Sequence, residues 1–196
     1  QFIKKNNKWH ERYVKFTDQI KPEFFDVPTD IKKIEKKIKF KISFKQNFIE
    51  YSPLAFRYLK DLTNKIKLNN SGILIIDYGY VNSEMKDTLQ AVSKHKYTDL
   101  LRYSGNSDIT YNLSFDLISQ MIKKMGSFFQ IITTQKEFLT KLGILERAEI
   151  LSKNMPFSKK ADMYFRVKRL IDNKQMGNLF KVMLVTNTKN KFKLGF

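Results

Sequence analysis

Asp77 is the residue whose position most clearly permits chemistry, because it ends an apolar run. The run Ile73–Ile76 holds four apolar residues, three of them β-branched, which is typical of a strand buried on both faces. Ligands of open α/β sheets bind just beyond the carboxyl ends of such strands, and Gly79 then permits a sharp turn. Asp77 is therefore either a functional carboxylate or an aspartate that only caps a turn.

More polar residues lie between positions 81 and 113, a segment without clean helical or strand periodicity. Long irregular segments of a compact domain often carry a functional site. If this stretch were helical, His95 and Asp99 would share a face and could pair; otherwise His95 is an ordinary surface histidine. The polar residues of the segment are Asp87, Thr88, His95, Asp99, Asp108 and Thr110.

The flanking sequence predicts the elements that position these residues. A hairpin is expected over 1–20, with strands at 1–5 and 9–16, followed by a loop over 21–30 and a short lysine-rich helix over 31–40. Ser52 and Pro53 are a good helix start, a hydroxyl cap followed by proline at the first helical position. Apolar residues then recur every four positions, and 69–72 ends the helix. The residues of this apolar face are Leu54, Tyr58, Leu62 and Ile66.

The second half of the chain continues the alternation of helices and strands. Ser114 opens a helix that runs to Met125, and a strand follows over 128–133. Thr134 and Glu137 form a capping-box pattern for the next helix, which Gly143 breaks. A helix over 159–171, a strand over 179–186 and a frayed tail over 187–196 complete the chain. Neither an internal repeat nor a linker divides residues 1–196, so one domain is expected.

Composition narrows the class of protein. The net charge of +18 suggests polyanion binding, but lysine supplies 31 of the 37 basic residues, whereas arginine is the usual reader of phosphates and bases. The lysines are also spread along the chain, as A/T-rich coding bias would produce, which disfavours specific nucleic-acid binding. The chain has no cysteine and two histidines, so no metal site is expected. No run reaches the roughly 18 apolar residues that span a bilayer.

Several familiar motifs are absent, and spacing alone leads no further than an α/β domain. The sequence has no glycine-rich dinucleotide fingerprint, no phosphate-binding loop and no serine-hydrolase elbow. It begins with a strand-like Gln1–Lys5 and without methionine, from which we expect that an upstream part is missing.

Nine short motifs, in order along nearly the whole chain, resemble the MidA family of class I S-adenosylmethionine-dependent methyltransferases. Each motif is weak by itself, and their agreement in order is the signal. The motifs lie at Gln1–Lys5, Trp9–Arg12, Glu50–Pro53, Gly72–Gly79, Asp87–Leu89, His95–Leu101, Gly105–Thr110, Gln135–Ile144 and Met176–Val182.

The resemblance implies the C-terminal part of a Rossmann-like sheet whose last strands are antiparallel, preceded by the N-terminal β-hairpin. In this family the glycine-rich cofactor motif and its acidic ribose partner precede the residues present here. The resemblance therefore implies S-adenosylmethionine as cofactor, bound mainly by a missing N-terminal half, and a domain that is incomplete and inactive alone. Relatives carry histidine or aspartate where this chain has Asn112, which leaves an acid/base role there open.

The mitochondrial members methylate an arginine of a complex I subunit, so the resemblance implies a protein-arginine acceptor. A protonated guanidinium is a poor nucleophile, and carboxylates must orient it and accept a proton. Asp77 and Asp108 are the expected catalytic carboxylates, with His95 assisting or ordering its loop, although Asp108 could equally only brace the loop. Substrate contacts are expected from Tyr78, Gly79, Thr88, Asp99 and Thr110.

Two other functions stay open. The chain could be a non-catalytic remnant that binds a respiratory-complex subunit during assembly, or a basic RNA-binding module. The resemblance implies the bacterial cytoplasm or the mitochondrial matrix, with the bacterial location favoured. The acceptor protein and the oligomeric state are not specified by the sequence.

Overall fold

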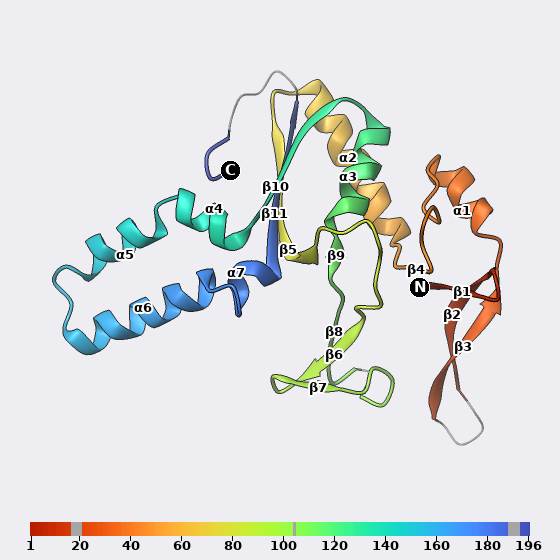
Figure 1. The fold of residues 1–196 in the computed structure, drawn as a ribbon, viewed down its shortest axis with the longest axis horizontal. Coiled ribbons are helices and arrows are strands. Elements are labelled where there is room, and N and C mark those ends of the chain that lie inside the picture. The colour runs from red at the N-terminus through yellow and green to blue at the C-terminus, as the bar shows by residue number, and fades with distance from the viewer. Residues whose placement is uncertain (17–20, 104, 188–192) are drawn as a thin grey trace.

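The structure, a computed structural model, describes residues 1–16, 21–103, 105–187 and 193–196 (Figure 1). Its centre is a four-stranded sheet in the order β10-β11-β5-β9. β11 runs antiparallel to both of its neighbours, whereas β5 and β9 are parallel. The antiparallel arrangement of the last strands is as predicted. The strands are β5 (Gly72–Tyr80), β9 (Leu113–Ser114), β10 (Phe128–Thr134) and β11 (Phe180–Asn187).

Two helices, α2 (Pro53–Leu68) and α3 (Phe115–Met125), cover one face of this sheet. Both begin at the predicted serine caps: the Ser52 hydroxyl accepts a hydrogen bond from the Ala55 amide, and the Ser114 hydroxyl accepts one from the Leu117 amide. The cap closes an otherwise unpaired amide, which contributes about 1 kcal/mol to helix stability.

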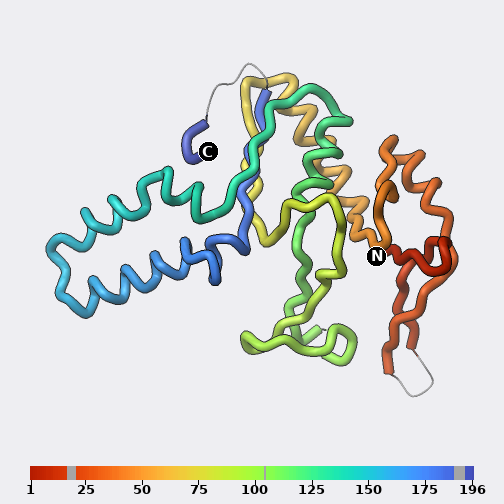
Figure 2. The backbone as a smooth tube through the Cα atoms, in the orientation of Figure 1, coloured from red at the N-terminus to blue at the C-terminus, as the bar shows by residue number. Residues whose placement is uncertain are grey.

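A helical arm projects from the other side of the sheet (Figures 1 and 2). Gly143, with φ of +80°, ends the first of its helices as predicted. The Thr134 hydroxyl accepts from the Glu137 amide, and the Glu137 carboxylate accepts from the Thr133 hydroxyl and from the Thr134 backbone amide, as the predicted capping box requires. The helices are α4 (Gln135–Lys141), α5 (Ile144–Ser152), α6 (Phe157–Ile171) and α7 (Met176–Leu179).

The N-terminal region forms a second sheet, in the order β3-β2-β1-β4. Its first hairpin was predicted, and Asn6 and Asn7 turn it with positive φ angles. The predicted loop over 21–30 is wrong, because β3 pairs with β2 along its whole length. Proline is tolerated there since β3 is an edge strand. The elements are β1 (Phe2–Lys5), β2 (Lys8–Phe16), β3 (Pro22–Pro28), α1 (Ile31–Ile38) and β4 (Phe48–Ile49).

The segment after β5 contains a small sheet in the order β7-β6-β8, so the prediction of an irregular segment is wrong. Strands of three or four residues are too short to give a readable alternation. Lys94 and His95 turn the β6–β7 hairpin with positive φ angles. Because this is a strand pair, the helical pairing of His95 with Asp99 does not occur. The strands are β6 (Gln90–Ser93), β7 (Lys96–Thr98) and β8 (Asp108–Thr110).

The expectation that β5 is buried on both faces is also wrong for this chain. Ile73 and Ile75 pack against the core under α2 and α3, whereas Leu74 and Ile76 on the other face are each 48% exposed. In the described part of the chain, this face of β5 is therefore only about half covered.

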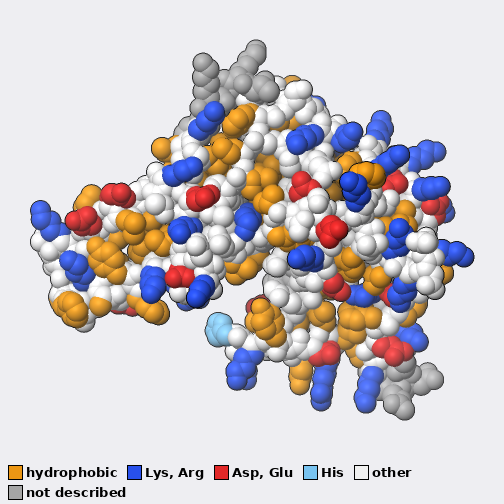
Figure 3. All heavy atoms as spheres, viewed as in Figure 1, with side chains coloured by type: hydrophobic (Ala, Val, Ile, Leu, Met, Phe, Trp, Pro, Cys, Tyr) orange, Lys and Arg blue, Asp and Glu red, His pale blue; other side chains and the backbone are white. Residues whose placement is uncertain are grey.

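Two whole-chain predictions concern the tail and the charge. Half of the predicted frayed tail, residues 188–192, lies outside the described residues, whereas the ring of Phe196 packs 5.2 Å from that of Phe138. Lysine and arginine side chains are spread over the face in Figure 3 and do not form one patch. Within the described ranges, no helix has the length and apolarity to cross a membrane.

Candidate functional site

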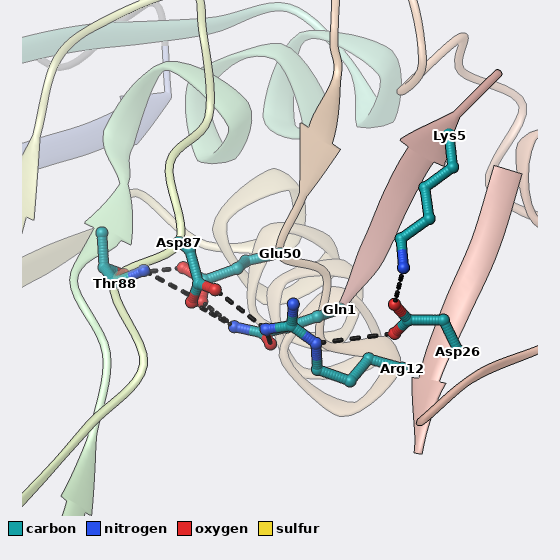
Figure 4. Close-up of polar contacts among 7 residues, drawn as sticks. All are labelled: Gln1, Lys5, Arg12, Asp26, Glu50, Asp87 and Thr88. Carbon is teal, nitrogen blue, oxygen red and sulfur yellow. Dashed lines mark hydrogen bonds and ion pairs between the residues drawn. The ribbon is translucent and has the colours of Figure 1, made fainter. Parts of the chain in front are cut away.

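A hydrogen-bonded cluster of side chains joins the N-terminal sheet to the segment that follows β5 (Figure 4). The Gln1 amide nitrogen donates to Glu50 Oε1 and to Asp87 Oδ1, both at 2.8 Å. One amide group therefore bridges two carboxylates that are 37 positions apart in the chain. Glu50 is half-buried and Asp87 is exposed, so the cluster lies at the surface with one carboxylate turned inward.

Arg12 holds this cluster from the side of β2. Its Nη1 donates to Asp87 Oδ2 and to the Gln1 side-chain oxygen, both at 2.9 Å. Its Nε lies 3.6 Å from Asp26, which Lys5 also contacts at 2.7 Å. The Lys5 hydrogen bond, with the Arg12 charge behind it, holds the pKa of Asp26 below its ordinary value of 3.8. The hairpin β2–β3 thus fixes the guanidinium that orients Asp87.

Thr88 connects Glu50 to the chain that enters β9. Its hydroxyl donates to Glu50 Oε2 at 2.6 Å, and the backbone amide of Asn112 donates to the same hydroxyl at 3.0 Å. Both Glu50 oxygens are therefore held in place by neutral donors. A carboxylate positioned in this way keeps its negative charge available on the side that faces away from the donors.

An apolar cavity of about 290 Å³ lies beside Glu50, between α2 and α3 and above β5. Glu50 and Asn112 stand among mainly apolar and aromatic walls, and Tyr80 and Tyr111 are also part of the lining. Pockets with apolar walls and few polar groups are typical of ligand sites. A larger cavity of about 890 Å³ borders α1 and the loop after it, but none of the predicted site residues lines it.

Two of the tyrosines that line the smaller cavity, Tyr80 and Tyr111, stay protonated at neutral pH. Burial raises the pKa of Tyr80, and the nearby Glu50 charge adds to the shift. Burial also raises the pKa of Tyr111, with contributions from the charges of Glu50 and Asp77. The charges of both carboxylates therefore act on the Tyr111 hydroxyl. Neutral phenols beside a carboxylate can donate hydrogen bonds and offer ring faces to a cation.

Asp77, the residue on which the sequence focused, lies in β5 opposite Lys181 of β11. It is half-buried, and its carboxylate accepts a hydrogen bond from the Tyr78 amide at 2.7 Å. Tyr78 is turned to the exposed face, with its ring 4.2 Å from that of Phe180. Gly79 is required by sterics, since a Cβ there would lie 2.5 Å from the Leu113 carbonyl oxygen and from the Phe115 ring.

The other predicted residues lie on the β6–β8 sheet. His95 and Asp108 are exposed, and within the described contacts no hydrogen bond or ion pair joins either of them to Asp77. Asp99 accepts from the amides of Leu101 and Arg102, which lowers its pKa and caps a turn. Thr110 accepts from Gln90 at 3.2 Å. Of the predicted set, Thr88 joins the Glu50 cluster, and Asp77 does not line the smaller cavity, although its charge acts on Tyr111.

Sequence reasoning did not assign Gln1, Arg12, Glu50 or Asp87 a role, although a signal was present. Each of the four belongs to a different one of the nine motifs that carried the family resemblance. Those motifs, scattered over the first 89 positions, meet in one hydrogen-bonded cluster. The sequence alone does not show which motifs lie close together in the folded chain, so it could not predict this cluster.

The described residues do not form a cradle for S-adenosylmethionine. Such a cradle needs an open glycine turn between a strand and a helix N-terminus. Gly79, at the end of β5, has its space filled by Leu113 and Phe115, and Gly143 follows a helix instead of a strand. No group of three histidine, cysteine or acidic residues in the described ranges could hold a metal ion.

Comparison with known families decides the class of protein. The family model described as "Putative S-adenosyl-L-methionine-dependent methyltransferase" matches residues 1–133. The chain belongs to this methyltransferase family. Its membership agrees with the MidA resemblance and establishes S-adenosylmethionine as the cofactor of the family.

Individual relatives are longer than this chain. "Protein arginine methyltransferase NDUFAF7, mitochondrial" from Xenopus tropicalis is 28% identical over 141 residues, which cover 71% of this chain and 32% of the relative. The human protein of the same name is 28% identical over 137 residues, covering 69% and 30%. The chain thus spans about a third of the length of these relatives.

Two solved structures from Burkholderia thailandensis share the fold of this family member. One, a protein of the COG1565 superfamily, is 21% identical to this chain with a TM-score of 0.80. The matched region covers 99% of this chain and 53% of the neighbour's chain. The other, crystallised with S-adenosyl-homocysteine, has a TM-score of 0.78 and 22% identity, and covers 100% and 51%. The whole described fold therefore corresponds to about half of each neighbour.

Proposed function

We propose that this chain is the acceptor side of a methyltransferase that modifies arginine in proteins. The observation that carries the proposal is the convergence of four family motifs at the Glu50 cluster beside an aromatic cavity. The relatives named protein arginine methyltransferases supply the acceptor class. The Rossmann-like sheet, of which this chain would form the C-terminal half, is part of the same proposal.

The cavity has properties that suit an arginine side chain. The aliphatic stem of arginine would lie along apolar walls such as Leu59 and Met121. The guanidinium would meet the Glu50 carboxylate and the ring faces of Tyr80 and Tyr111. A carboxylate in this position can also accept the proton that the guanidinium nitrogen loses when it becomes a nucleophile.

Asp77 remains our proposed second carboxylate, since its charge reaches Tyr111 at the same cavity. Asp108 and His95 stay predictions: they face solvent on the β6–β8 sheet, where they could contact the acceptor protein but not the cavity wall. Tyr78, Asp99 and Thr110 stay predictions as substrate contacts in the same sense.

Cofactor binding would come from a part of the protein outside this chain, so we propose that the chain is inactive alone. The absence of a glycine cradle among the described residues supports this proposal. Participation in complex I assembly stays a prediction from the family resemblance. The mitochondrial relatives favour the matrix as location, and the bacterial cytoplasm is the alternative.

An arginine peptide binding to the chain tests the acceptor site without any cofactor. We expect the peptide Gly-Arg-Gly, titrated in an NMR experiment, to shift signals of Glu50, Tyr80 and Tyr111, and Gly-Lys-Gly to shift them less. Glu50→Gln should weaken the binding by about tenfold, because a charged hydrogen bond at a half-buried carboxylate is lost. Glu84→Gln, at an exposed glutamate, is the matched control. Equal binding of both peptides, or no effect of Glu50→Gln, would contradict the proposal.

A further inference from the structure

The helical arm ends in the turn between α5 and α6, which lies far from the central sheet (Figures 1 and 2). The two helices pack against each other, and Ser152, the last residue of α5, is only 1% exposed. The Met155 amide closes the turn with a hydrogen bond of 3.0 Å to the Ser152 carbonyl. The projecting end of the arm is therefore a fixed turn, and we call residues 150–160 the arm tip.

Four large apolar side chains of the arm tip are exposed to solvent. Phe157, the first residue of α6, is 86% exposed, and Ile150 is 69% exposed. Leu151 and Met155 are exposed as well. Large apolar side chains that gather at one place on the surface mark an interaction site. The arm tip is thus expected to bind something that accepts apolar side chains.

The charged residues of the arm tip are all basic. They are Lys153, Lys159 and Lys160, so the arm tip has a net charge of +3 and contains no acidic residue. Among the described residues, no ion pair involves any of these three lysines. Asp162, the next acidic residue along α6, is already paired with Arg166 at 2.9 Å. Hydrophobic and basic side chains lie together at the outer end of the arm in Figure 3.

Exposed aromatic and aliphatic side chains among lysines are typical of segments that bind a membrane surface. The apolar side chains enter the boundary between the headgroups and the acyl chains, and the lysine ammonium groups stay at the level of the lipid phosphates. The closed turn suits such a position, because unpaired backbone polar groups are costly near acyl chains. The composition and the geometry of the arm tip therefore agree.

The charge of the arm tip also favours a lipid surface over a protein partner. Two copies of the arm tip would bring two sets of three unpaired lysines together, and like charges repel. A different protein would have to offer an apolar hollow for the projecting Phe157 and acidic groups around it. A membrane leaflet with anionic lipids offers both over its whole surface.

We infer that the arm tip binds the surface of a membrane that contains anionic lipids, with Phe157 and Ile150 inserted and the lysines at the headgroups. This binding is confined to the surface, since no helix of the described ranges is suited to cross a membrane. The arm projects away from α2 and α3 (Figure 1). A chain bound by its arm tip would therefore keep the Glu50 cluster away from the lipid and open to an acceptor protein.

Sedimentation of the chain with lipid vesicles tests this inference. At about 0.1 M salt, which screens the long-range attraction of exposed charges, we expect the chain to sediment with vesicles of equal parts phosphatidylglycerol and phosphatidylcholine. Binding to vesicles of phosphatidylcholine alone should be at least about tenfold weaker. Equal binding to both vesicles, or binding to neither, overturns the inference.

The apolar part of the contact is tested by one substitution and a matched control. Phe157→Ser should raise the Kd for the anionic vesicles by about tenfold, because the inserted ring is lost. Leu68→Ser, at a leucine of α2 that is 85% exposed and outside the arm, should leave the Kd within about twofold. Both side chains are exposed, so thermal unfolding of both variants should match the parent chain.

The lysines of the arm tip are compared with a second pair of neighbouring lysines. The double variant Lys159→Gln, Lys160→Gln should raise the Kd by about fivefold for each lysine. The double variant Lys32→Gln, Lys33→Gln, at exposed lysines of α1, removes the same charge elsewhere and should change the Kd by less than about twofold in total. If the arm-tip variants and their controls had equal effects, the overall charge of the chain would drive the binding, and the inference would be overturned.

Insertion and self-association are distinguished by two further measurements. Phe157→Trp adds a fluorophore to a chain whose only tryptophan is Trp9, and lipids brominated in their acyl chains should quench this variant more than the parent. Quenching equal to that of the parent would overturn the insertion of Phe157. Analytical ultracentrifugation without lipid should show no dimer that Phe157→Ser dissociates. Such a dimer would assign the arm tip to a second copy of the chain and overturn the inference.

Discussion

At the scale of single residues, the site depends on carboxylates whose oxygens are already positioned by hydrogen-bond donors, which are neutral for Glu50 and include the Arg12 guanidinium for Asp87. Glu50 is held by Gln1 and Thr88, and Asp87 by Gln1 and Arg12. Such fixed charges do not have to reorganise when a cation arrives, which is the property that a guanidinium site needs. The sequence identified the strand-end aspartate Asp77 because a local pattern marks it, but it could not identify Glu50, whose partners come from distant positions.

Asp26 gives the clearest dependence of stability on pH. Its pKa is lowered in the folded chain by Lys5 and Arg12, so its ionised form stabilises the fold at pH values above about 4, the ordinary pKa range of an aspartate. That contribution is lost as the pH falls through the lowered pKa.

Asp26→Asn should therefore reduce the free energy of unfolding by about 0.5 to 1 kcal/mol at pH 7, with a difference from the parent that shrinks below pH 4. Urea unfolding at a series of pH values measures this difference. Asp61→Asn, at an exposed aspartate of α2, is the control. A difference that stays constant from pH 7 to pH 3 would contradict the role given to the Lys5 and Arg12 contacts.

At the scale of elements, most helices and the long strands could be predicted, because their signals are local. Ser52 with Pro53, Ser114 and Gly143 mark helix ends through their own backbone and hydroxyl chemistry. β3 was missed because proline normally argues against a strand, and only the tertiary position at a sheet edge removes that objection.

The β6–β8 sheet was missed because its strands are short and their pairing depends on residues far apart in the chain. The burial of β5 was overestimated for a related reason. Apolar residues on both faces of β5 indicate that both faces should be buried. They do not indicate whether another element of the chain packs against each face.

At Gly79, β5 packs so closely against β9 and α3 that there is no room for a side chain larger than a hydrogen atom. A methyl group at this position would collide with the Leu113 carbonyl and with Phe115, which is fully buried. Gly79→Ala should force β5 and β9 apart and lower the free energy of unfolding by about 2 kcal/mol.

Urea unfolding of Gly79→Ala tests this packing. Gly72→Ala, at the other end of β5, should cost less, because the nearest atom there is a threonine methyl at 3.0 Å. An unchanged urea midpoint for Gly79→Ala would contradict the close contact between the two strands.

At the scale of the whole molecule, the fold combines the proposed acceptor side with a strand, β5, that is paired along most of its length on one side only. The solved neighbours match all of this fold with only about half of their own length. The N-terminal sheet β1–β4 lies on the same side of the central sheet as α2 and α3, away from the helical arm (Figure 1). We therefore propose that this chain binds the acceptor and that another part of the protein binds the cofactor.

The division between acceptor side and cofactor side is tested most directly by isothermal titration of the chain with S-adenosyl-homocysteine. We expect no measurable heat of S-adenosyl-homocysteine binding for the chain alone. We expect S-adenosyl-homocysteine to bind once the cofactor-binding half of the Burkholderia thailandensis neighbour is added to the chain. The half alone, titrated in the same way, is the control. Binding of S-adenosyl-homocysteine to this chain alone, with a Kd on the order of micromolar, would contradict this division.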